Sequence, residues 1–217
     1  MSKRLNVFFV ATFLLSTSVG WAADANTPIE CGETSTFYPL GYLWSVTPPR
    51  LDNPIALSFF QGAPTNTGSS GLELSDAKNA VMRAFSTWES TTCDSVNPNI
   101  PHFVASATDH PTLDQGDVWD GLELVSHKNV VYWDNTGDNP LLSSGTVAYT
   151  LVNFFDVTAQ AIDGDMMFND SDYSWRVSTD DSSKGCTAGD VNCFDIETVA
   201  LHEAGHLIAF GHVNCAE

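Results

Sequence analysis

A short segment near the end of the chain, HEAGHLIAFGH, holds three of the six histidines of this protein. His202 and His206 are four residues apart, so on a helix their imidazoles lie on one face. Neutral imidazole is a good zinc ligand, and catalytic zinc commonly takes three protein ligands and a water. Glu203 follows the first histidine, where it can accept a proton from that water. His212 becomes the third ligand if the helix ends near 209–211 and the chain turns back.

A helix is expected to carry these side chains. Residues 196–210 have helical spacing, with Asp195 as the N-cap and Glu197 in the first turn, where the helix dipole favours acids. The alternative is an amphipathic helix with incidental histidines. The spacing disfavours it, because half of the histidines in the chain fall in this one array.

The elements before this helix indicate a layered fold with a mixed sheet. A second helix is expected over 74–88, capped by Ser75 or Asp76, because its apolar residues share one face. Residues 61–71 read as a loop and residues 170–193 as a Ser- and Asp-rich loop. Strands are expected from the β-branched and aromatic runs at 55–60, 102–106, 129–133 and 146–156, the last paired with 161–169. The order of elements predicts an α+β or α/β fold.

The composition narrows the class of protein. The 217 residues carry 8 Lys and Arg against 27 Asp and Glu, a formal charge of −19. This acidity argues against nucleic acid and against anionic membrane surfaces as partners. Apolar residues make up 43% of the chain, which is enough for a buried core. We expect a monomer.

The first 22 residues have the layout of a secretory signal peptide. Lys3 and Arg4 are followed by an apolar run over 5–19 and by small residues near Ala22, after which we expect cleavage. The apolar run is short for a membrane span, so we expect no membrane span in the processed protein. We expect that protein to be secreted, extracellular or periplasmic. A buried N-terminal helix is the less favoured alternative. Residues 23–45 are expected to form an irregular arm, and 46–217 the functional domain.

Export makes disulfides the expected state of the five cysteines. Cys186 and Cys193 flank a short polar loop and form the first expected pair, and Cys31 and Cys93 the second. Cys215 is then left as a free thiol, an intermolecular bridge or a residue whose partner is missing.

The segment HEAGHLIAFGH resembles the HExxHxxGxxH signature of the metzincin zinc endopeptidases, and within them that of the matrixins, in particular bacterial exported members. Three upstream segments, AVMRAFSTWES (80–90), NVVYW (129–133) and DGDMMFND (163–170), are similar to helix and strand segments of that family. FDIETVALHEAGH (194–206) resembles its approach to the zinc helix. The resemblance covers about residues 40–212.

The resemblance implies a mixed, twisted sheet with flanking helices and a zinc-binding helix at the C-terminal end. His202, His206 and His212 would hold catalytic Zn²⁺, and Glu203 would act as the general base in peptide-bond hydrolysis. The resemblance implies a protein or peptide substrate, which would lie extended along an edge strand, for which 146–156 is the candidate.

This chain departs from the family pattern in two features. The family has a glycine where this chain has Ala209, and alanine tolerates a positive φ poorly, so Gly211 is the alternative turn residue. The family also has a Met-containing turn after the third histidine, whereas only residues 213–217 follow His212 here. We therefore expect either a fragment, which the unpaired Cys215 favours, or a degenerate, non-catalytic exported zinc-binding module.

Other candidate sites stay open as alternatives. A carboxylate could replace His212 as the third zinc ligand. Cys31 and Gly32 could form a latency switch, although a plain disulfide cysteine is favoured. A Ca²⁺ site could use the acidic residues Asp163, Asp165, Asp170 and Asp172, although a solvated acidic loop is favoured. A second zinc site could use His102, His110 and His127, although scattered surface histidines are favoured.

Overall fold

The computed structural model describes twelve segments, which include strands at all five expected places and both expected helices. They are residues 5–10, 43–44, 54–59, 64–65, 72–91, 101–107, 129–137, 139–142, 145–155, 160–179, 182–187 and 190–210.

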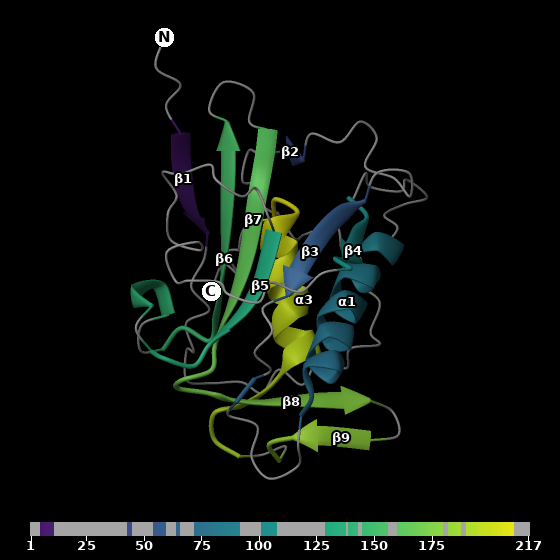
Figure 1. The fold of residues 1–217 in the computed structure, drawn as a ribbon, viewed down its shortest axis with the longest axis vertical. Helices are drawn as coiled ribbons and strands as arrows, with labels where there is room; N and C mark the ends of the chain where they lie inside the picture. The colour runs from purple at the N-terminus through teal and green to yellow at the C-terminus, as the bar shows by residue number, and fades with distance from the viewer. Residues whose placement is uncertain are drawn as a thin grey trace, which may run out of the picture.

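A mixed β-sheet forms the centre of the molecule (Figure 1). Its order is β1-β6-β7-β5-β3-β4, and β2 also pairs with β7. Strands β4, β3, β5 and β7 run parallel to one another, whereas β6 is antiparallel to both β7 and β1. The bounds are β1 (Leu5–Val10), β2 (Leu43–Trp44), β3 (Ile55–Phe59), β4 (Phe103–Ala105), β5 (Asn129–Asp134), β6 (Ala148–Phe155) and β7 (Gln160–Asn169). The expected mixed sheet is thus confirmed.

Helix α1 (Leu74–Ser90) connects the parallel neighbours β3 and β4, which need such a crossover. Its N-cap is Glu73, not Ser75 or Asp76. The Asp76 carboxylate is nevertheless part of the helix start, because it accepts a hydrogen bond from the Glu73 amide at 3.2 Å. The acidic side chain thus satisfies a backbone donor from the N3 position, as in a capping box.

Helices α1 and α3 (Ile196–Leu207) lie side by side in Figure 1. The apolar face of α1 that the sequence predicts is buried in the core that it shares with the sheet and α3. Strand β5 is buried on both faces, which explains its uninterrupted apolar run. A smaller cluster of buried residues contains Val130, Tyr132, Leu142, Tyr149, Leu151 and Met167. Leu142 is the last residue of a short 3₁₀ helix, Pro140–Leu142.

A second, three-stranded sheet replaces the loop that the composition predicts over 170–193. Its order is β10-β8-β9, with β8 at Ser174–Thr179, β9 at Ser182–Gly185 and β10 at Cys193–Asp195. The loop prediction is wrong because Trp175 and Val177 alternate with polar residues and enter the core, which is a strand pattern. The expected disulfide Cys186–Cys193 is confirmed.

The sequence predicts that 146–156 forms an edge strand. In the structure β6 is second from the edge, because β1 lies outside it. Residues 5–10, within the predicted leader, form β1 and pair with β6 along its length. Cleavage after Ala22 would remove β1 and leave β6 as the edge strand. Leu43 and Trp44, in the expected irregular arm, form the short strand β2.

None of the helices in the described segments is long and apolar enough to span a membrane.

Candidate metal centre

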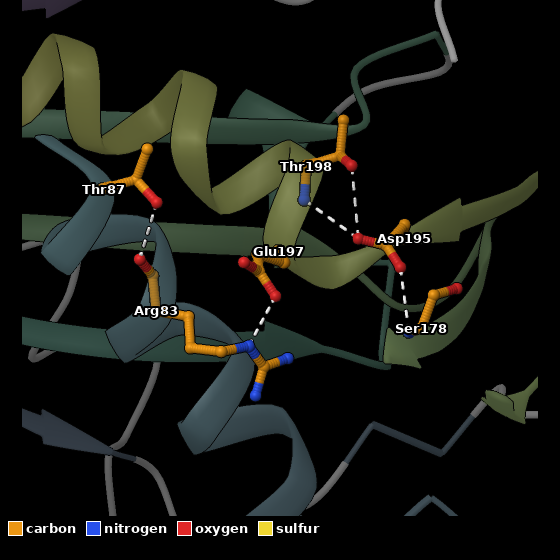
Figure 2. A network of polar contacts seen from close by, with 6 residues as sticks. All are labelled: Arg83, Thr87, Ser178, Asp195, Glu197 and Thr198. Atoms are coloured by element: carbon orange, nitrogen blue, oxygen red, sulfur yellow. Dashed lines mark hydrogen bonds and ion pairs between the residues drawn. The ribbon is translucent and has the colours of Figure 1, made fainter. Parts of the chain in front are cut away.

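The start of α3 is held by side chains from two other elements (Figure 2). Asp195 is the N-cap, as predicted: its Oδ1 accepts hydrogen bonds from the Thr198 amide at 3.0 Å and hydroxyl at 3.2 Å. Its Oδ2 accepts a third from the Ser178 amide of β8 at 3.1 Å. Glu197 pairs with Arg83 of α1, with Nε and Oε2 2.6 Å apart. These contacts fix the position of α3 against the small sheet and α1.

His202 and His206 converge one turn apart on α3. Their Nε2 atoms are 3.1 Å apart, and their rings are nearly perpendicular, at 89°. Two Zn–N bonds of 2.0–2.1 Å at a tetrahedral angle would separate two nitrogens by about 3.4 Å. The pair is therefore spaced to within a few tenths of an ångström of two ligands of one zinc ion.

The tautomer of His206 follows from its second ring nitrogen. Nδ1 lies 2.7 Å from the carbonyl oxygen of Phe210, which can only accept a hydrogen bond. Nδ1 therefore carries the proton, and in the neutral ring Nε2 has the free electron pair that a metal needs. A hydrogen bond of this kind is the usual support of a metal-binding histidine.

Helix α3 ends at Leu207, three residues before the predicted end. The Phe210 amide donates to the Gly205 carbonyl at 2.9 Å, and the Ala209 amide to the His206 carbonyl at 2.9 Å. These two bonds, with Ala209 at φ 79°, make a Schellman turn. Ala209 itself adopts the left-handed conformation that glycine favours, whereas Gly211 lies outside the described residues.

The third expected ligand, His212, also lies outside the described residues, so its role stays a prediction. Within the segments that are described, no three His, Cys, Asp or Glu side chains form a group that could hold a metal ion.

Glu203 follows His202 in the sequence, is fully buried and contacts β6 through Thr150. Its Oε2 is 2.6 Å from the hydroxyl of Thr150, and its Oε1 has no hydrogen-bond partner among the described residues. Burial raises the pKa of Glu203 to about 8, against a smaller lowering by the Thr150 hydrogen bond. The carboxyl group is therefore mostly protonated near neutral pH as long as no cation lies beside it.

Trp88 and Gly205 belong to the surroundings of this site and are missing from the residues that the motif singles out. A Cβ at Gly205 would lie 2.9 Å from Cζ2 of Trp88, so only glycine fits under the indole. A glycine inside a helix often marks such a close approach, and this is the signal that could have found the pair.

The other candidate groups do not form a metal site of three or more side chains among the residues that the structure describes. His102 pairs with Glu89 at 2.8 Å, while His110 and His127 lie outside the described residues. The four acidic residues accept hydrogen bonds from different partners: Asp163 from Asn153, Asp165 from Val130, Asp170 from Thr65, and Asp172 from Asn169. Cys31, Cys93 and Cys215 lie outside the described residues, so their pairing is not tested.

No family model, no curated protein and no solved structure matches this chain.

Proposed function

We propose that this protein is an exported zinc-dependent endopeptidase of the matrixin type. One observation carries the proposal: two imidazoles converge with Nε2 atoms 3.1 Å apart, and a fully buried glutamate follows the first of them. The helical spacing, the tautomer of His206 and the convergence of the rings all fit a zinc ion held by His202, His206 and His212.

A bound Zn²⁺ supplies Lewis acidity and lowers the pKa of a coordinated water toward about 7. Glu203 would accept a proton from the attacking water and later deliver it to the leaving amine. Without metal, burial raises the pKa of Glu203. A bound cation would stabilise the ionised carboxylate and lower this pKa, so Glu203 could then act as a base. Thr150 would hold one carboxylate oxygen during this cycle and leave the other for the proton.

Strand β6 is the proposed binding edge for substrate. Residues 5–10 pair with it in an antiparallel ladder, which supports strand addition at this edge. After removal of the leader, an extended peptide would take that place by strand addition, in which main-chain hydrogen bonds supply affinity.

The decisive experiment compares two glutamates of α3. The protein, together with any residues that its coding sequence adds after Glu217, is assayed for bound zinc and for casein or gelatin cleavage. We expect Glu203→Ala to lower cleavage at least 100-fold with zinc content unchanged, since general bases contribute about 10²–10⁴-fold. Glu197→Ala is the matched control, because Glu197 is also buried but bonds to Arg83 at the other end of the helix.

Cleavage that persists in Glu203→Ala would remove the proposed mechanism. Zinc binding without any cleavage in the unaltered protein would instead support the alternative, a non-catalytic exported zinc-binding module.

A further inference from the structure

We propose that Trp88 of α1 is a positioning residue of the metal centre, which orients His206 through the carbonyl group of Phe210. The orientation of His206 can be tested in the metal-free chain. The inference that this orientation affects zinc affinity rests on the proposed function.

Trp88 contacts α3 at two places and the turn after it at a third, and these contacts bracket both histidines. The indole Nε1 donates a hydrogen bond to the Leu201 carbonyl at 2.7 Å, one residue before His202. The ring lies over Gly205, where an added Cβ would come within 2.9 Å of Cζ2 of the indole. It also stacks on Phe210, with centroids 5.3 Å apart and planes 20° apart. One side chain thus links the helix before the first histidine to the turn after the second.

Phe210 passes this support on to His206. Its side chain lies against Trp88, while its carbonyl oxygen accepts the Nδ1 proton of His206 at 2.7 Å. The position of that carbonyl depends on the turn at Ala209, a non-glycine residue at φ 79°. Alanine in this conformation is disfavoured by about 1–2 kcal/mol, so the turn needs contacts from outside the helix, and the stack with Trp88 provides one.

The hydrogen bond decides which nitrogen of His206 is available to a metal. Without it, the neutral ring exchanges between two tautomers, and one of them carries its proton on Nε2, where it blocks coordination. Loss of such a partner typically lowers metal affinity 10–100-fold. Trp88 would therefore tune zinc affinity although it is not itself a ligand.

Two substitutions separate this role from general packing. Phe210→Leu removes the stacked ring but keeps the backbone carbonyl, and Trp88→Phe keeps a ring but removes the N–H that bonds to Leu201. Phe194→Leu is the control: it removes an aromatic residue that contacts Tyr173 and Trp175 away from the histidines.

Two measurements on the full-length chain test the proposal. Nitrogen-15 NMR at pH 8 reports the His206 tautomer in the metal-free protein, and competition with a chelator reports zinc affinity. We expect one tautomer, with the proton on Nδ1, in the unaltered protein and in Phe194→Leu. In Phe210→Leu and Trp88→Phe we expect a mixture of tautomers and zinc binding that is 10–100-fold weaker.

An unchanged tautomer in both site variants would overturn the proposal, as would equal losses in all three variants. If the unaltered protein binds no zinc, the proposed function fails, and the NMR measurement alone decides the role of Trp88.

Discussion

The hydroxyl group of Thr150 on β6 lies 2.6 Å from Oε2 of Glu203 on α3 and 3.1 Å from the carbonyl oxygen of the same residue. The two residues are 53 positions apart in the sequence, and both side chains are fully buried. This contact joins the strand proposed to bind substrate to the proposed general base. It also fixes one oxygen of the buried Glu203 carboxyl group.

Replacing Thr150 should therefore affect the chemical step. We expect Thr150→Val, which keeps the shape of the side chain without the hydroxyl, to lower kcat tenfold or more with little change in KM. A hydrogen bond to a charged group contributes about 1.5–3 kcal/mol, and 1.4 kcal/mol corresponds to tenfold. Thr150→Ser should retain most of the activity. A valine variant with unaltered peptidase kinetics would show that the contact has no catalytic role.

Glu203 should make the metal-free protein less stable as pH rises. Its pKa is about 8 in the folded chain and near 4.5 when unfolded, so the folded state binds the extra proton between these values. Its contribution is fully present below pH 4.5 and is lost as pH rises to about 8. Unfolding in denaturant at pH 4.5 and pH 7 should differ by about 3 kcal/mol more in the unaltered protein than in Glu203→Gln.

The same comparison controls for other groups. Burial also raises the pKa of Asp165, but that group titrates equally in both proteins and cancels in the difference. Identical pH profiles for the two proteins would contradict a raised pKa at Glu203.

Gly205 should be intolerant of a methyl group. We expect Gly205→Ala to destabilise the protein by about 1–3 kcal/mol in chemical unfolding, because the new Cβ would overlap the indole of Trp88. In the double variant Trp88→Leu/Gly205→Ala the overlap is relieved, so the two effects should not add. Strict additivity would show that the close approach does not limit residue 205.

Ala209→Gly should stabilise the protein by about 1 kcal/mol, because glycine adopts φ 79° without steric cost. Ala204→Gly serves as the control within the same helix and should destabilise, since Ala204 is fully buried and helical. Both effects can be measured by urea unfolding. A lower stability of Ala209→Gly would argue against the left-handed turn.

The Cys186–Cys193 disulfide connects the residue after β9 to β10, two positions before the N-cap of α3. Replacing both cysteines with serine should lower stability by about 2–3 kcal/mol, as expected for a cross-link that closes a short loop. A reducing agent should destabilise the unaltered protein at least as much. If the double serine substitution has no effect on stability, other contacts hold the loop.

Local features of this protein could be read from the sequence because each depends on neighbours along the chain. The i, i+4 spacing places His202 and His206 together on any helix, and Asp195 caps the helix that follows it. Two further features could be read from the sequence in the same way. They are the apolar runs that form β3, β5 and β7, and the Cys186–Cys193 disulfide. The small sheet could have been found as well, because Trp175 and Val177 alternate with polar residues, but its Ser- and Asp-rich composition concealed the pattern.

Other features required the tertiary structure, because they join residues that are far apart in the sequence. Neither the hydroxyl of Thr150 nor the indole of Trp88 carries a motif that assigns it to Glu203 or to Phe210. The burial that raises the pKa of Glu203 comes from the packing of α3 against β6 and the core. The sequence by itself thus determined the pair of histidines and its helix, since backbone geometry alone sets that spacing. Only the fold decided how Glu203 is buried, held and oriented, since those contacts exist only once distant segments meet.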